Sequence, residues 1–278
     1  MTDSARLACL SLALALGAAG SPRHVVALLI DDLGYDDLGF RNEQQIRTPH
    51  LTQLHSGGVT MANYYVQPSC SPTRAAILTA RKPLHTGINF WLPNIAAGLS
   101  LDEVTLPQVL QRRGFVSHAV GKWHLGFYKT EYTPTFRGFS SFYGYYEGME
   151  DYFTHTKGGG YDFHDEPRMF CGPGCTQRPR LQGQYSTNLL STRAVHLIDR
   201  HDTSRGLFLY LAYQAVHAPR QAPSHYIEPY SRTISDPGSM TAQLFGMQMG
   251  LSSSRVAQEG EEVSGRHSNF PTFPLPGS

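Results

Sequence analysis

The sequence predicts an α/β domain in which helices flank a largely parallel sheet. Its core would be built on continuous runs of β-branched and aliphatic residues, which are typical of strands covered on both faces. Such runs occupy residues 24–30, 115–120 and 207–212. Helical patterns separate them, and the order strand, helices, strand, helix, strand favours parallel pairing.

The helices are marked by their own start and stop residues. Thr48 fits a helix cap, and Pro49 fits the first position of a helix that ends at Gly57. Gly114 ends another apolar pattern and predicts a helix terminus there. Further helices are expected at residues 72–78, 106–113 and 187–200.

The two ends of the 278-residue chain differ from its middle. Arg6, a short apolar run and small residues near position 20 predict a secretory signal peptide at residues 1–20 rather than a buried helix. The run is too short for a transmembrane anchor, which needs about 20 apolar residues. We expect the fold at residues 21–234 and a divergent, mostly disordered tail at residues 235–278. The protein is therefore expected in the secretory pathway, as a lysosomal or extracellular protein.

The charge balance excludes some classes of partner. Lys and Arg total 23 and Asp and Glu total 22, so the net charge is +1. This balance gives no electrostatic reason to expect nucleic acid or an anionic membrane surface as a partner. A hydrophobic content of 40% is sufficient for a buried core.

The cysteines suggest one disulfide and one unpaired thiol. Cys171 and Cys175 flank a three-residue turn, which favours a local disulfide in an oxidising compartment. A zinc site that also uses His155 and His164 is the alternative, although the spacing is not that of a standard structural zinc motif. Cys70 is left over, either as a buried spectator or as a reactive group.

Polar side chains follow each predicted strand. Asp31 and Asp32 follow the first strand, Lys122 and His124 the second, and His217 the third. Ligands of open α/β sheets bind at the carboxyl ends of the strands, so these groups are expected to meet. Paired carboxylates attract Ca²⁺ or Mg²⁺, although each residue alone would also fit a turn or surface role.

Two neighbouring carboxylates can share one ion only if the backbone bends between them, because successive side chains of a strand point to opposite faces. Gly34, which follows the Asp31-Asp32 pair closely, would permit such a bend.

The segment Cys70-Ser71-Pro72-Thr73-Arg74 resembles the sulfatase signature Cys-x-Pro-Ser-Arg, in which the cysteine is oxidised to formylglycine. The resemblance covers residues 24–231 and is nearest to the arylsulfatase B, I and J group. Further matching segments are Asp31-Asp32-Leu33-Gly34, Thr48-Pro49-His50-Leu51, Leu78-Thr79-Ala80-Arg81, Gly121-Lys122-Trp123-His124-Leu125-Gly126 and Arg137-Gly138-Phe139.

This resemblance implies an alkaline-phosphatase-like fold with a mixed, largely parallel sheet. It also implies hydrolysis of sulfate esters, either aryl sulfates or glycosaminoglycan sugar sulfates. The partners would be a sulfated small molecule or glycan and, during maturation, the formylglycine-generating enzyme. By the same resemblance, one Ca²⁺ ion would be held by Asp31, Asp32 and the formylglycine made from Cys70.

The resemblance also implies residue roles that make chemical sense. A hydrated aldehyde carries two hydroxyls: one attacks sulfur as the alcohol leaves, and the other then drives elimination of sulfate. The cation would polarise the sulfate oxygens. Arg74 would stabilise the hydrated aldehyde, Lys122 and His217 would hold the sulfate, and His124 would orient or deprotonate the nucleophile.

The chain departs from the family pattern in ways that support other interpretations. Thr73 and Ala80 replace the usual Ser and Gly. The family's downstream Asp-Asn ligand pair and a further lysine have no match after His217. The sequence thus predicts a truncated sulfatase fold whose isolated chain has little activity. The alternatives are an inactive isoform that at most binds a partner and a related metal-dependent phosphoesterase, which the cysteine at the nucleophile position disfavours.

Overall fold

A computed structural model describes residues 24–42, 47–90, 92, 95–166 and 177–232. The predicted signal peptide, the tail at residues 235–278 and the Cys171–Cys175 disulfide lie outside the described residues and stay predictions. The helices are α2 (Pro49–Gly57), α3 (Cys70–Thr79), α4 (Pro83–Thr86), α5 (Leu106–Arg112), α6 (Ser186–Asp199) and α7 (Ser224–Ile227). Short 3₁₀ turns cover Thr130–Tyr132, Pro134–Phe136, Pro179–Leu181 and Glu228–Tyr230.

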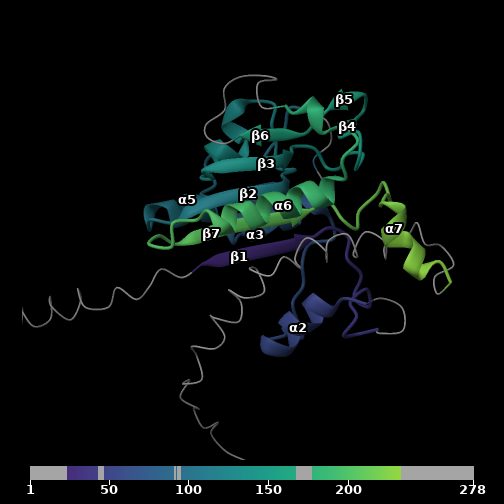
Figure 1. Ribbon diagram of the computed structural model, residues 1–278. Helices are drawn as coiled ribbons and strands as arrows, with labels where there is room; N and C mark the ends of the chain where they lie inside the picture. The colour runs from purple at the N-terminus through teal and green to yellow at the C-terminus, as the bar shows by residue number, and fades with distance from the viewer. Residues whose placement is uncertain (1–23, 43–46, 91, 93–94, 167–176, 233–278) are drawn as a thin grey trace, which may run out of the picture.

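A five-stranded mixed sheet forms the centre of the molecule (Figure 1). Its strand order is β1-β7-β2-β3-β6, and the pairs β1–β7, β7–β2 and β2–β3 are parallel. The edge strand β6 pairs antiparallel with β3. The strands are β1 (Val25–Ile30), β2 (Val116–Lys122), β3 (Ser141–Tyr145), β6 (His164–Glu166) and β7 (Leu207–Tyr213), and β4 (Thr156–Lys157) and β5 (Gly160–Tyr161) form a separate pair.

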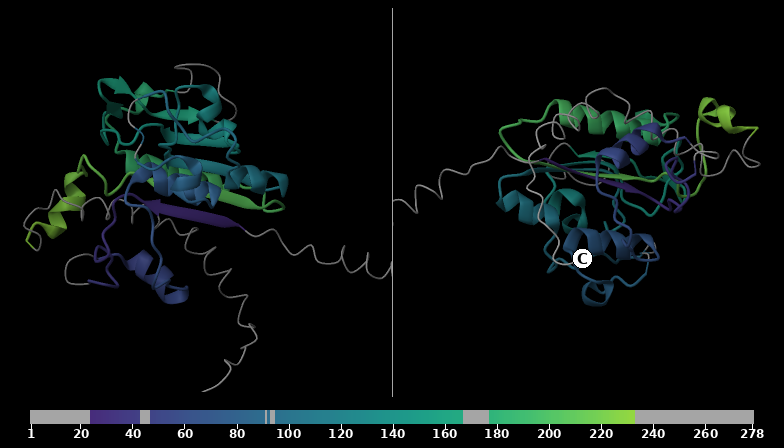
Figure 2. Two further views of the ribbon diagram at one scale, coloured as in Figure 1. Left: turned by 180° about the vertical axis from the view of Figure 1, so that it is seen from behind. Right: turned by 90° about the horizontal axis from the view of Figure 1, so that it is seen from below.

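Helices cover both faces of this sheet. Helix α6 lies on one face, and α3 and α5 lie on the other (Figure 2). Every residue of β7 is buried. Its side chains alternate, because Leu209 and Leu211 join the core cluster with α6 whereas Phe208 and Tyr210 join the cluster with α3. A continuous apolar run is therefore what this central strand requires, as the sequence predicted.

The boundaries of the predicted elements hold with small corrections. Helix α3 begins at Cys70 rather than at Pro72, so the cysteine itself occupies the first turn. Thr48 is the N-cap residue of α2 as predicted, but its side chain makes no cap bond, since its hydroxyl accepts a hydrogen bond from the Gly39 amide at 2.7 Å. Strands β3 and β6 were not predicted, although the buried aromatic run of β3 is a usable signal.

Two glycines let the strands approach closely just before they end. Gly121 has φ +106°, and a Cβ there would lie 1.9 Å from the Ala212 carbonyl oxygen of β7. Gly144 of β3 has φ +152°, and its Cβ would meet the backbone of Gly121. Only glycine fits such contacts, so these positions bring the ends of three strands together beside Lys122.

Candidate active site

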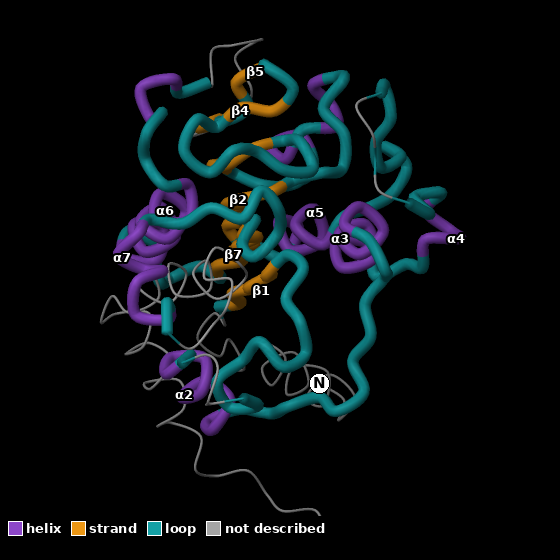
Figure 3. Tube along the Cα trace, turned by 90° about the vertical axis from the view of Figure 1, so that its right-hand side faces the viewer, coloured by secondary structure: helices purple, strands orange, loops and turns teal. Residues whose placement is uncertain are grey.

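The carboxyl ends of β1, β7 and β2 meet at one edge of the sheet, which faces the viewer in Figure 3. Asp31 follows β1, Lys122 is the last residue of β2, and His217 lies in the loop after β7. The loop is tied to β1 because the Asp31 amide donates to the Ala215 carbonyl at 3.1 Å and the Val216 amide donates to the Asp31 carbonyl at 2.7 Å. The predicted convergence of these strand ends is therefore present.

Asp31 is the electrostatic centre of this edge. Lys122 Nζ donates to Asp31 Oδ2 at 2.6 Å, and Arg74 Nη2 lies 3.4 Å from Asp31 Oδ1. All three side chains are buried. Burial alone would raise the pKa of Asp31, but the charges of Arg74 and Lys122 outweigh it and hold that pKa below its usual value.

Arg74 is held by further contacts from the sheet. Its Nη1 donates to the Lys122 carbonyl at 3.0 Å and lies 3.5 Å from the Tyr210 hydroxyl. Helix α3 thus anchors a charged side chain against strands β2 and β7. Because Cys70 is one turn earlier on the same helix, this anchoring also sets where its sulfur lies.

Cys70 and His217 lie next to each other at the same edge, with their ligand atoms within 4.8 Å of each other. Burial would raise the pKa of the Cys70 thiol, but the hydrogen bond with His217 and the charge of Lys122 lower it. The hydrogen bond with Cys70 raises the pKa of His217 despite burial, and the bond from His217 Nδ1 to the Ala218 carbonyl, at 2.7 Å, acts in the same direction. The pair therefore favours thiolate and imidazolium.

Asp32 lies at the rim of this cluster. Its φ of +59° puts the backbone bend at Asp32 itself rather than at Gly34, which corrects the sequence-based expectation. Its side chain is 62% exposed, and its Oδ2 lies 3.7 Å from His217 Nε2. The turn thus separates the roles of two adjacent carboxylates, one buried and one open to solvent.

His124 is buried and held in one orientation. Its Nε2 donates to the Leu92 carbonyl at 2.9 Å, and its Nδ1 has no hydrogen-bond partner among the described atoms. Burial, reinforced by the charge of Lys122, lowers the pKa of His124 to about 3. The ring is therefore neutral near pH 7, with Nδ1 able to accept a hydrogen bond. A Cβ at Gly148 would lie 2.7 Å from the ring, so this glycine makes room for it.

The loop that carries His217 is clamped by residues that sequence reasoning missed. The Gln214 side chain donates to the Glu150 carbonyl at 2.7 Å and accepts from the Glu150 amide at 2.9 Å. The Tyr152 hydroxyl donates to the His217 carbonyl at 2.9 Å. The Tyr152 amide donates to the Gln221 side chain, also at 2.9 Å. In sequence these residues show only ordinary polar and aromatic character, which carries no signal of this role.

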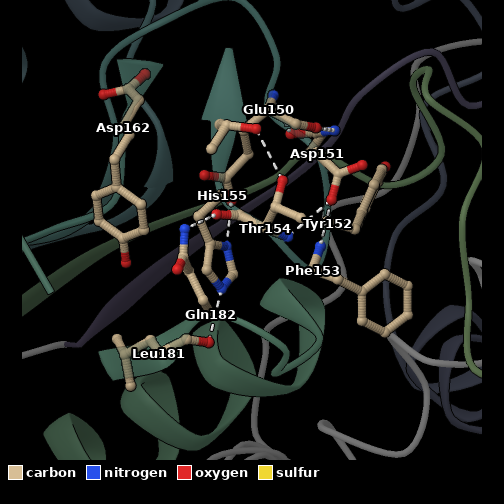
Figure 4. Close-up of polar contacts among 12 residues, drawn as sticks. Glu150, Asp151, Tyr152, Phe153, Thr154, His155, Asp162, Leu181 and Gln182 are labelled. Carbon is tan, nitrogen blue, oxygen red and sulfur yellow. Dashed lines mark hydrogen bonds and ion pairs between the residues drawn. The ribbon is translucent and has the colours of Figure 1, made fainter. Parts of the chain in front are cut away.

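Residues 150–155, which clamp this loop, are themselves held by hydrogen bonds (Figure 4). The Asp151 carboxylate accepts hydrogen bonds from the amides of Phe153 and Thr154, which closes a tight turn. His155, fully buried, lies between Glu150 Oε1 at 3.3 Å and the Leu181 carbonyl at 3.1 Å. His155 therefore has a structural role here, beside a Glu150 whose pKa burial raises well above its usual value.

Comparisons with known proteins agree with this arrangement. A family model described as Sulfatase matches residues 23–249. The chain belongs to the sulfatase family. Its curated relatives include arylsulfatase J of Mus musculus, 40% identical over 227 residues, and N-acetylgalactosamine-6-sulfatase of Homo sapiens, 31% identical over 234 residues. These matches cover 79% and 76% of this chain but only 37% and 43% of the relatives' own length.

Solved structures confirm the predicted sulfatase fold. The crystal structure of Ps i-CgsB has a TM-score of 0.74 and 27% identity, and the match covers 90% of this chain and 57% of that one. A structure of BT4656 in complex with D-glucosamine-2-N,6-O-disulfate shares the fold, with a TM-score of 0.60 and 20% identity over 77% of this chain and 38% of that one. Among the described residues of this chain, no helix has the length and apolar character needed to cross a membrane.

The sulfatase site offers a donor set for a divalent metal ion, which the family generally uses together with a formylglycine. Ligand atoms of Asp31, Cys70 and His217 all lie within 4.8 Å of one another. The carboxylate oxygens of Asp31 and Asp32 suit a hard cation such as Ca²⁺ or Mg²⁺. Sulfur is a soft ligand, so position 70 fits such an ion once the thiol has been replaced by an oxygen-bearing group.

Proposed function

We propose that this chain carries the nucleophile half of a sulfatase active site, and that the reaction this site supports is the hydrolysis of sulfate esters through a formylglycine made from Cys70. The observation that carries the proposal is the convergence of Asp31, Cys70 and His217 with buried Lys122 at the carboxyl edge of the sheet. This edge is where ligands of open α/β sheets bind.

The proposed substrate class is a sulfated sugar or aryl sulfate. One curated relative is named N-acetylgalactosamine-6-sulfatase, which acts on a sugar sulfate by its name. Ps i-CgsB has also been solved in complex with a neocarrahexaose, with 26% identity to this chain and a TM-score of 0.73. These two relatives support a glycan as the substrate, whereas arylsulfatase J, by its name, supports an aryl sulfate.

Two groups would complete the chemistry: the formylglycine made from Cys70 during maturation, and a bound Ca²⁺ ion. The hydrated formylglycine would supply the paired hydroxyls, and Ca²⁺ held beside it would supply Lewis-acid polarisation of the sulfate oxygens. Asp31 and Asp32, together with position 70, would hold the ion. Within the chain, the Lys122 ammonium and the His217 ring bind the negative sulfate oxygens and keep the ester near position 70.

Arg74 and His124 act on position 70. Arg74 stays charged, since its neighbours Tyr210 and Asp31 raise its pKa in spite of burial, and it orients an oxygen at position 70 from one turn along α3. His124, neutral with Nδ1 open, accepts a hydrogen bond from a hydroxyl, and its lowered pKa favours orienting that hydroxyl over deprotonating it.

The first test concerns the chemical state of position 70. The full chain is co-expressed with a formylglycine-generating enzyme, and the peptide containing Cys70 is analysed by mass spectrometry. Formylglycine together with Ca²⁺-dependent hydrolysis of para-nitrophenyl sulfate supports the proposal, provided that Cys70→Ala is inactive. An unmodified thiol, or hydrolysis that survives in Cys70→Ala, overturns it.

The same assay separates the other functions. Hydrolysis of para-nitrophenyl phosphate instead of the sulfate ester identifies a metal-dependent phosphoesterase. Formylglycine without turnover identifies an inactive sulfatase-fold protein that at most binds a partner.

We also propose that maturation occurs in the secretory pathway, on the strength of the sequence at residues 1–20. N-terminal sequencing of protein secreted from eukaryotic cells tests this point. A mature chain that begins near residue 21 supports the proposal, and an intact Met1 contradicts it.

A further inference from the structure

Two segments that hold His124 also line a separate cavity of about 380 Å³. One is the loop after β2, which includes Phe127 and Tyr128, and the other is Tyr146 and Glu147 after β3. The opposite wall comes from the β4–β5 pair and from β6. The volume lies within the range of about 300–1,000 Å³ that is common for ligand pockets.

The cavity and the proposed sulfate site are neighbours across His124. The His124 amide donates to the Tyr146 carbonyl at 3.0 Å, and Tyr146 is a lining residue. Gly148, which follows the lining residue Glu147 by one position, lies against the His124 ring. His124 therefore connects the wall of this cavity to the proposed sulfate site.

Aromatic rings give the cavity broad apolar surfaces. The ring centroids of Phe127 and Tyr146 lie 5.7 Å apart in a stacked arrangement, and the side chains of Phe127 and Tyr128 are half-exposed. Tyr161 of β5 contributes from the other wall. The C–H faces of a pyranose ring carry partial positive charge and pack against such aromatic faces. The lining thus suits a sugar ring better than a compact inorganic ion.

The charged groups of the lining favour an anionic substituent on that sugar. Lys129 and Lys157 both line the cavity. Asp162 is already used within the protein, because its carboxylate accepts the amides of Tyr146 at 3.1 Å and Glu147 at 2.8 Å and also pairs with His164. Burial, followed by the neighbouring Asp162, raises the pKa of the Glu147 carboxyl, which lessens its negative charge at acidic pH.

We propose that this cavity binds an acidic sugar unit, bearing a sulfate or a carboxylate, in the same glycan chain as the ester at Lys122. The inference rests on the proposed function for the identity of that chain. It adds a second subsite in which Lys129 and Lys157 attract the anionic group while Phe127, Tyr128 and Tyr161 pack against the ring. No covalent step takes place there.

Binding rather than turnover tests this subsite. Calorimetric titration of the full chain compares N-acetylgalactosamine 6-sulfate with a tetrasaccharide of alternating uronic acid and sulfated N-acetylgalactosamine. We expect the tetrasaccharide to bind at least about tenfold more tightly, and the double variant Lys129→Ala/Lys157→Ala to lose about that factor. The variant should bind the monosaccharide as wild type does. Lys82→Ala, which removes an exposed lysine outside the lining, is the matched control.

The outcomes separate the subsite from the catalytic proposal. Equal affinities for the two sugars, or equal losses in the cavity variant and the Lys82→Ala control, overturn the subsite even if the chain is an active sulfatase. Selective loss of tetrasaccharide binding in the cavity variant supports the subsite even if no sulfate is released. A neutral tetrasaccharide that binds as tightly as the acidic one contradicts the assigned role of the lysines.

Discussion

The Tyr152 hydroxyl donates a hydrogen bond to the backbone carbonyl of His217 at 2.9 Å, across 65 residues of sequence. Tyr152 is fully buried, so its hydroxyl has little access to water as a substitute partner. This bond, with the Gln214 contacts to Glu150, decides where the His217 imidazole stands relative to Cys70. Tyr152 is thus a positioning residue for the proposed sulfate-binding histidine.

Replacing Tyr152 with phenylalanine should therefore weaken sulfate binding with little loss of stability. The lost hydrogen bond costs about 1 kcal/mol of unfolding free energy, and the freed His217 loop lowers affinity for inorganic sulfate. Calorimetric titration with sulfate and urea unfolding measure the two effects. Tyr213→Phe is the control, because its buried hydroxyl bonds to Ser191 of α6 instead. Equal sulfate affinity in both variants would show that the Tyr152 bond does not position His217.

Asp31 and Asp32 should differ sharply in their effect on stability. Asp31→Asn leaves Lys122 and Arg74 buried without their counter-charge, which should cost about 3–5 kcal/mol. Asp32→Asn changes a largely exposed side chain and should stay within about 0.5 kcal/mol. Urea unfolding at pH 7 measures both values. Similar losses in the two variants would contradict the assignment of Asp31 as the electrostatic centre.

Stability should fall as the pH decreases below the ordinary pKa of histidine, and His124 should carry part of that slope. The folded-state pKa of about 3 lies below the unfolded value of 6.5, so between these values only the unfolded chain takes up the proton. The resulting loss is about 1.4 kcal/mol per pH unit.

His124→Gln removes this contribution and should flatten the slope between pH 6 and pH 4, as measured by urea midpoints at several pH values. His118, whose pKa burial lowers to about 4, contributes a slope of the same sign in both proteins. Asp31 adds to the loss only below its ordinary pKa of 3.8, because there the unfolded carboxyl takes up a proton while the folded one, with its lowered pKa, stays ionised. Parallel slopes in the two proteins would show that His124 is protonated in the folded chain.

Unconverted Cys70 should react quickly with iodoacetamide at pH 6.5. The hydrogen bond with His217 and the Lys122 charge favour the thiolate against the effect of burial. His217→Ala should slow alkylation several-fold at that pH, and mass spectrometry of the Cys70 peptide follows the rate. Because Cys70 is part exposed, access alone does not prevent the reaction. An unchanged rate in His217→Ala would exclude His217 as the group that activates the thiol.

The sequence was sufficient for the strands that build the site. The continuous apolar runs of β1, β2 and β7 indicate strands buried on both faces, and the carboxyl ends of parallel strands share one edge. Asp31, Lys122 and His217 could therefore be placed together without coordinates. The motif from Cys70 to Arg74 identified the family, which the comparisons confirm. The outer strands β3 and β6 were harder to predict from the sequence, because β3 contains Gly144 and β6 is a short antiparallel strand.

The sequence by itself determined the fold class, the family and the residue types that gather at the sheet edge, because these follow from local hydrophobic pattern and a contiguous motif. The tertiary structure decided the division between buried Asp31 and exposed Asp32, which depends on a positive φ at Asp32. It also decided the Tyr152–His217 bond and the cavity beside His124. These features join segments far apart in the chain, and their geometry is set by packing rather than by any periodicity along the sequence.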